Sequence, residues 1–157
     1  MITTAVVTFI ISVSSSFSFL LAIENAGDRI AAMVTALTEN KYLILLLFNL
    51  ILLLLGAVME AGVVLILFTP ILYPIAIGVG VDPIHFGVVM VVNLMIGVAT
   101  PPVGVSLFVM SHVSGVRLET LMREVLPFIW PLLLVLLVVT YFPELVLWLP
   151  NLWMSKP

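Results

Sequence analysis

The sequence predicts an all-α membrane protein in which transmembrane helices are accompanied by a re-entrant helical hairpin and a discontinuous helix. Hydrophobic residues make up 64% of the chain and charged residues only 8%, far from the roughly 25% charged residues of soluble domains. The apolar residues occur in runs near or above the ~20 residues that cross the hydrocarbon core of a lipid bilayer. Proline and glycine interrupt the longest runs, which are too long to cross as single straight helices.

Charge and cysteine content exclude several classes of function. The net charge of −3 is small and scattered, so no basic patch for a nucleic acid is expected. The absence of cysteine excludes a disulfide framework and thiolate chemistry. No nucleophile–base motif, phosphate loop or zinc spacing occurs, so we expect neither an enzyme nor a cofactor. His85 and His112 lack further metal ligands at useful spacing, and a structural or interfacial role is expected for both.

Residues 4–23 and 28–40 predict a transmembrane helix followed by an interfacial helix. The first segment is apolar and rich in serine, which favours close packing of helices. No lysine or arginine precedes it, so a cleavable signal peptide is not expected. In the second segment, apolar residues recur from Ile30 to Leu37 at i, i+3, i+4 and i+7. This spacing predicts an amphipathic helix at the membrane surface.

Residues 43–80 predict a helical hairpin. Their only acidic or basic residue is Glu60, and one continuous helix of this length would measure about 60 Å, twice the hydrocarbon core. The chain must therefore turn, and Gly56 and Gly62 on either side of Glu60 mark the place. Two prolines further on form a second set of helix breakers. A re-entrant hairpin of two half-length helices is the preferred interpretation, and two ordinary spans with a tight loop are the alternative.

Residues 84–113 predict a transmembrane helix that is broken in its middle. No charged side chain occurs between residues 83 and 116, and about 50 Å of helix cannot form one straight span. The break falls at the motif TPPVG, because proline lacks an N–H group and moves its predecessor away from the α region. An interfacial linker at residues 117–124 and a last transmembrane helix at residues 125–149 are expected to follow.

The break in the helix supplies candidate ligand groups. The two prolines remove the N–H donors that would serve the carbonyls of Gly97 and Val98, and Thr100 adds a hydroxyl. Unpaired carbonyls at membrane depth are tolerated where they line a protein-enclosed cavity, and the helix after the break starts with a partial positive charge. Such oxygen donors suit an alkali cation. The alternative is a proline kink that a neighbouring helix covers.

Glu60 is the second feature that indicates a binding site. A carboxylate at the bilayer centre costs roughly 2.5 kcal/mol or more, so such residues usually face a cavity, a proton or a cation. At the tip of a hairpin it can equally be an ordinary polar residue. The candidate sodium- and substrate-binding residues are Gly56, Glu60, Asn93, Gly97, Thr100, Pro101, Pro102 and Gly104. Among them, Gly97 and Thr100 are the expected ligands of the metal ion.

Discontinuous helices opposed to a hairpin, with polar oxygens at the breaks, are typical of ion-coupled secondary transporters. This pattern predicts a class of protein and no particular substrate. Two alternatives stay open. The same carbonyls could line an oligomeric channel, or the chain could be a non-transporting membrane scaffold subunit in which the breaks are incidental.

The motifs DPIHFG and TPPVG, together with GAVMEAG and LPFIWP, resemble the C-terminal part of the large membrane subunit of TRAP transporters, the tripartite ATP-independent periplasmic systems. The resemblance covers essentially the whole chain. It implies one repeat of an elevator-type ion-transporter fold in a multi-pass protein of the bacterial inner membrane. It further implies sodium-coupled import of organic acids of the C4-dicarboxylate or sialic-acid class. A small membrane subunit and a periplasmic substrate-binding protein are the implied partners.

The resemblance also implies roles for individual residues. The hairpin and the broken helix resemble the elements that hold one sodium ion and border the substrate, through Gly56, Glu60, Gly97, Thr100, Pro101 and Gly104. Large TRAP subunits contain two inverted repeats, and this chain of 157 residues supplies about one, the C-terminal half. We therefore expect that the isolated chain does not transport.

Overall fold

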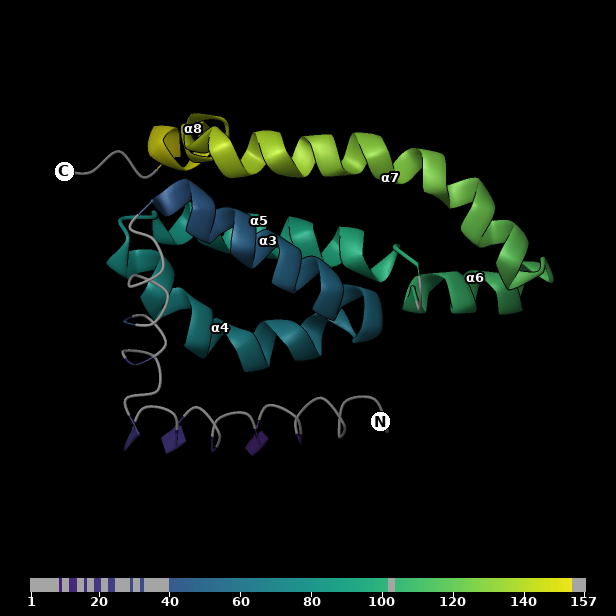
Figure 1. Cartoon of the computed structure of the whole chain (residues 1–157), viewed down its shortest axis with the longest axis horizontal. Coiled ribbons are helices and arrows are strands. Elements are labelled where there is room, and N and C mark those ends of the chain that lie inside the picture. The colour runs from purple at the N-terminus through teal and green to yellow at the C-terminus, as the bar shows by residue number, and fades with distance from the viewer. Residues whose placement is uncertain are drawn as a thin grey trace.

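The computed structural model describes residues 40–101 and 104–153, together with isolated residues among the first 39. The helices predicted at 4–23 and 28–40 lie almost entirely outside the described residues. The described part is all-helical and contains no strand, which confirms the predicted all-α class there. Its elements, labelled in Figure 1, are α3 (Lys41–Val58), α4 (Ala61–Gly78), α5 (Pro83–Val98), α6 (Val105–Ser114), α7 (Leu118–Tyr141) and α8 (Pro143–Trp153).

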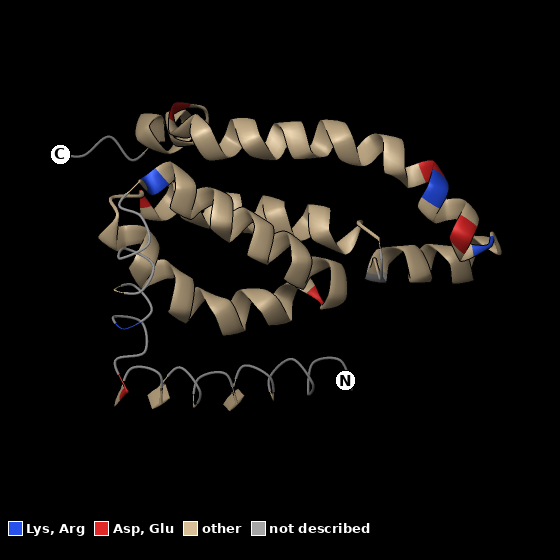
Figure 2. Ribbon diagram, in the orientation of Figure 1, with Lys and Arg blue, Asp and Glu red and all other residues tan. Residues whose placement is uncertain are grey.

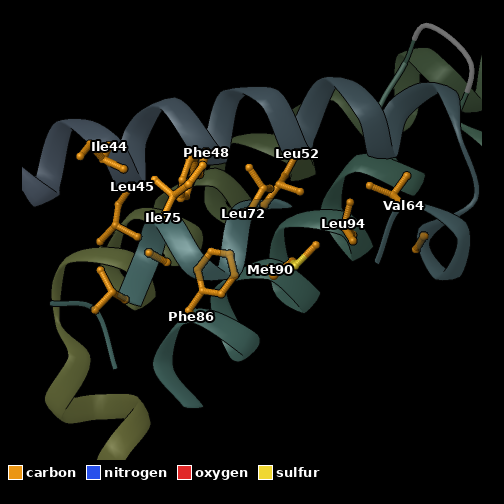
Figure 3. Packing of buried hydrophobic residues seen from close by; sticks show 13 residues of the cluster. Ile44, Leu45, Phe48, Leu52, Val64, Leu72, Ile75, Phe86, Met90 and Leu94 are labelled. Carbon is orange, nitrogen blue, oxygen red and sulfur yellow. The ribbon is translucent and has the colours of Figure 1, made fainter. Parts of the chain in front are cut away.

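Helices α3, α4 and α5 form the packed centre of the described part (Figure 1). Short connections make neighbours antiparallel, so α3 and α5 run in the same direction. Figure 3 shows the apolar side chains that all three helices direct into the space between them. The Phe48 and Phe86 rings meet edge to face there, with 6.0 Å between their centroids. The largest labelled members of this cluster are Ile44, Leu45, Phe48, Leu52, Leu72, Ile75, Phe86, Met90 and Leu94.

The turn between α3 and α4 lies at Met59 and Glu60, inside the GAVMEAG segment where it was predicted. Both residues have extended backbones, so the helix cannot continue through them. Pro70 and Pro74, the second set of expected breakers, instead lie inside α4, which continues to Gly78. That part of the prediction is wrong, because helices packed in apolar surroundings tolerate proline where neighbouring groups serve the freed backbone.

Three described helices are long and apolar enough to cross a membrane, namely α3, α4 and α7. The two limbs of the hairpin have 18 residues each, about 27 Å of helix. A hairpin is therefore present, but its limbs are long enough to cross the hydrocarbon core, so the prediction of half-length helices is wrong. A re-entrant hairpin and two spans with a tight loop share this geometry.

The helix predicted at 84–113 is broken at the expected place. Helix α5 ends at Val98, and α6 begins at Val105 beyond the proline-containing segment. Asp82 starts α5, since its carboxylate accepts hydrogen bonds from the backbone N–H groups of Ile84 and His85.

The last helices differ from the prediction. The linker expected at 117–124 and the first part of the span expected at 125–149 form the single helix α7, which ends at Tyr141. Figure 2 shows that the charged residues of α7 lie near its beginning. The helix ends early because Pro143 has no N–H group and disfavours a helical backbone at Phe142. Pro143 then begins α8.

We expect Phe48→Ala to destabilise the protein by about 3–5 kcal/mol, because it leaves a cavity among α3, α4 and α5. Phe48 is 2% exposed. Thermal unfolding of the purified protein measures the effect. Leu54→Ala is the matched control, since Leu54 lies on the same helix and is 70% exposed. Equal melting temperatures of the two variants would contradict the assigned core.

Candidate functional site

The hairpin and the broken helix meet where α3 crosses α5 at Gly56 and Gly97. A Cβ atom on Gly97 would lie 2.8 Å from the Cα of Gly56 and 3.1 Å from the carbonyl oxygen of Leu53. A Cβ on Gly56 would lie 3.2 Å from the Cα of Gly97. The two backbones are therefore in direct contact, as small residues allow between membrane helices. Both predicted site glycines have this packing role.

A hydrogen bond joins the hairpin to the residue that starts α6. The Gly104 N–H donates to the carbonyl of Ala57 in the last turn of α3, at 3.1 Å. Gly104 has a φ of 53°, in the left-handed region that favours glycine. The structure thus brings Gly56, Gly97 and Gly104 together around the end of α3.

The carbonyls freed by the two prolines are not left unpaired. The Gly97 carbonyl accepts a hydrogen bond from the Thr100 N–H at 2.8 Å, because the chain tightens at the end of α5 into a turn of the 3₁₀ type. The Val98 carbonyl accepts one from the Ser106 hydroxyl at 2.9 Å. The expectation that these oxygens lack partners is therefore wrong. Each carbonyl oxygen still has a second lone pair, which a cation can share.

Thr100 lies in the break itself. Its hydroxyl donates to the Ile96 carbonyl at 2.7 Å, so the side chain folds back along α5. The hydroxyl oxygen keeps its acceptor capacity. Pro101, the next predicted site residue, is half-buried like Thr100, and Pro102 lies outside the described residues.

Glu60 is exposed at the turn between α3 and α4, where Figure 2 shows an acidic residue. One carboxylate oxygen accepts a hydrogen bond from the backbone N–H of Val63 at 3.0 Å. A carboxylate at this position caps α4 and complements the partial positive charge of its first turn. Glu60 therefore caps α4 at the exposed hairpin tip, which is the geometry expected of a polar tip residue.

Asn93, one turn before Gly97, is fully buried and binds α3. Its amide nitrogen donates to the Asn49 backbone carbonyl at 3.0 Å and to the Asn49 side-chain oxygen at 2.9 Å. The amide nitrogen of Asn49 in turn donates to the Thr140 hydroxyl at 2.8 Å. The side-chain oxygen of Asn93 is buried and has no hydrogen-bond partner in the described part of the chain.

Ser106 and Thr140 also take part in these hydrogen bonds, and neither was predicted from the sequence. Ser106 had a local signal, since it is a small hydroxyl residue about one turn beyond the two prolines whose missing N–H groups call for a donor. Thr140 had none, because its partner Asn49 lies 91 positions away in the sequence.

The described residues hold no group of three or more His, Cys, Asp or Glu that could bind a metal ion. Nε2 of His85 lies 2.8 Å from the carbonyl oxygen of Val139, a structural contact of the kind expected for this histidine. The oxygen atoms that the described residues place at the break, the carbonyls of Gly97 and Val98 and the hydroxyl of Thr100, are all neutral.

An apolar helical hairpin packed on a discontinuous helix is the arrangement typical of secondary transporters. The comparisons with known proteins agree with this class. Residues 1–145 match the family model described as "Tripartite ATP-independent periplasmic transporter, DctM component". The chain belongs to this family, which is one of transporter permeases and not of enzymes.

Three curated relatives show the range of the family. The chain is 47% identical over 143 residues to an isethionate TRAP transporter permease protein of Oleidesulfovibrio alaskensis, covering 91% of the chain and 22% of the relative. It is 42% identical to a sialic acid TRAP transporter large permease protein of Vibrio cholerae, covering 98% of the chain and 36% of the relative. It is also 42% identical to a C4-dicarboxylate TRAP transporter large permease protein of Pseudomonas aeruginosa, covering 97% and 35%. The chain thus spans at most about a third of these relatives.

We expect Gly97→Ala to destabilise the protein by about 1–3 kcal/mol, because the new methyl group meets the Gly56 backbone and forces α3 and α5 apart. Gly87→Ala is the matched control on the same helix, since a Cβ there meets nothing within 4 Å. Its expected effect is neutral or slightly stabilising, because alanine favours the helix. Thermal unfolding compares the two variants, and equal stability would contradict the close crossing.

Proposed function

We propose that this chain forms one part of a sodium-coupled secondary transporter that imports organic acids. The observation that carries the proposal is the contact between the hairpin and the helix break, made by the Gly56–Gly97 crossing and by the hydrogen bond from Gly104 to Ala57. This contact occurs in a chain of a transporter permease family. It places a carbonyl-rich helix end beside the start of another helix, which is the site geometry of discontinuous-helix carriers.

The break offers groups of opposite polarity. Helix α5 ends there with a partial negative charge that suits a cation, and α6 begins there with a partial positive charge that suits an anion. We assign the sodium ion to the Gly97 carbonyl and the Thr100 hydroxyl, whose oxygens both retain acceptor capacity. We assign the substrate's acidic group to the start of α6. A bound cation and a bound anion attract each other, so each raises the affinity for the other, and the two are coupled.

The names of the relatives support an anionic substrate. They name isethionate, sialic acid and a C4-dicarboxylate, all of which are organic anions. We propose an organic acid of the C4-dicarboxylate or sialic-acid class for this chain. A helix N-terminus recognises the negative charge that these substrates share.

We further propose that the hairpin is re-entrant and that the chain supplies one repeat of an elevator-type fold. The carboxylate of Glu60 lies at the tip, and a charge there is costly unless the tip ends against protein or water. Since the chain spans only 22% to 36% of the three relatives, the rest of the transporter would supply the second half of the site. The proposed partners are a small membrane subunit and a periplasmic substrate-binding protein in the bacterial inner membrane.

We expect Thr100→Val to raise the sodium concentration for half-maximal uptake by about three- to tenfold, since one oxygen ligand is lost. Uptake into proteoliposomes of the complete transport system, under imposed sodium gradients, measures this. Thr69→Val is the matched control, because the Thr69 hydroxyl also donates to the carbonyl four residues earlier but lies in α4, away from the break. An unchanged sodium requirement in Thr100→Val would remove this hydroxyl from the site.

We expect Glu60→Gln to leave the sodium requirement unchanged, because its amide oxygen can still accept the hydrogen bond of the Val63 N–H. Glu60→Ala removes the cap and should destabilise the protein by about 1 kcal/mol. Uptake and thermal unfolding of both variants separate the two roles. A raised sodium requirement in Glu60→Gln would show that the charge itself serves the cation.

A further inference from the structure

We propose that four buried polar side chains form a polar clamp that fixes α7 against α3 and α5. They are Asn49, His85, Asn93 and Thr140. By fixing α7, the clamp also sets the register in which the hairpin meets the helix break. Each of these side chains is at most 4% exposed. The clamp is a set of positioning residues. Its consequence for sodium binding rests on the proposed function, whereas its effect on geometry does not.

The first half of the clamp replaces a hydrogen bond that the helix cannot make. In a continuous helix, the carbonyl of Val139 would accept from the N–H of residue 143, which is a proline and has none. Nε2 of His85 lies 2.8 Å from this carbonyl oxygen. Since a carbonyl only accepts, this nitrogen carries the proton and donates it. The end of α7 is thereby attached to the first turn of α5.

The second half runs through three helices. Asn93 on α5 donates to Asn49 on α3, and Asn49 donates to the Thr140 hydroxyl on α7. Thr140 completes the chain by donating to the Leu136 carbonyl at 2.7 Å within its own helix. The amide nitrogens of Asn93 and Asn49 and the hydroxyl of Thr140 thus each donate to an acceptor of defined direction. In a buried apolar surrounding, water does not replace such a bond once it is broken.

Within the described part of the chain, few apolar contacts hold α7. Only 17% of its membrane-length window is buried, and its buried residues are Ile129, Leu136 and Thr140. Lipid chains are as apolar as these side chains, so sliding or rotating α7 changes its apolar contacts little. The clamp contacts lie at Val139 and Thr140, near the end of the helix, and they select a single position along it.

The clamp and the helix break attach the two ends of one segment, α6 and α7, to the same helix, α3. The arm made of α6 and α7 begins at Gly104, which is bonded to Ala57 near the end of α3. It ends at Thr140, which is bonded to Asn49 on the same helix. Figure 1 shows this arm leaving the packed centre and returning to it. Displacement of α7 is thus transmitted through α6 to the residues beside the break.

The experiment compares Thr140→Val, which removes the hydroxyl at nearly constant volume, with Thr140→Ser, which keeps it. The complete permease carries spin labels on cysteines introduced at Val58 and Phe108, which are 55% and 50% exposed and lie at the end of α3 and on α6. This chain contains no native cysteine that would compete for the label. Pulsed electron–electron double resonance in lipid nanodiscs measures the distribution of distances between the two labels. The variants His85→Leu and His85→Gln form a second pair for the same comparison.

We expect Thr140→Val and His85→Leu to shift or broaden the distribution, and Thr140→Ser and His85→Gln to restore it. Thr140→Val should also raise the half-saturating sodium concentration by about three- to tenfold, which is the effect expected from the loss of one interhelical hydrogen bond. The uptake rate at saturating sodium should stay the same. Unchanged distances in both Thr140→Val and His85→Leu would overturn the clamp, even if thermal stability falls. If the distances respond but the sodium requirement responds neither here nor in Thr100→Val, the clamp stands and the proposed sodium site fails.

Discussion

Prolines free main-chain carbonyls both at the break after α5 and at the end of α7, and apolar surroundings contain no water to satisfy them. The partners come from elsewhere in the chain. Ser106 donates to the Val98 carbonyl across the break, and His85 lies against the Val139 carbonyl at the end of α7. The requirement to pair these oxygens therefore decides which helices must lie together. The arrangement of α5, α6 and α7 follows from it.

The same requirement explains how the candidate site is built. A glycine contact holds the end of α3 against α5, and the hydrogen bond of Gly104 attaches the start of α6 to the same place. The ends of three helices thus converge without a side chain between them. Backbone dipoles, rather than charged side chains, give such a place its polarity.

The turns and breaks were predictable from the sequence because they depend on local chemistry. Glycine around Glu60 marked the hairpin turn, and adjacent prolines marked the break after Val98. The partners within the break, Thr100 and Ser106, lie close by in the sequence. The partner of the Val139 carbonyl, His85, was not predictable, because it depends on which helices pack together. Pro70 and Pro74 left α4 continuous, whereas Pro143 ended α7. Proline alone does not distinguish these outcomes, and Thr140 gave no local sign of its contact with Asn49.

The arm of α6 and α7 is held at its two ends and packs little between them. Substitutions therefore have very different consequences along it. In the middle of α7, one large apolar residue can replace another over evolutionary time, because Phe128 and Trp130 are 68% and 76% exposed and touch little of the described protein. The bond of Gly104 to Ala57 joins backbone to backbone, so at that attachment the constraint is the left-handed backbone of Gly104 itself. At Thr140 the constraint is the hydroxyl, because its loss leaves the buried Asn49 amide without this acceptor.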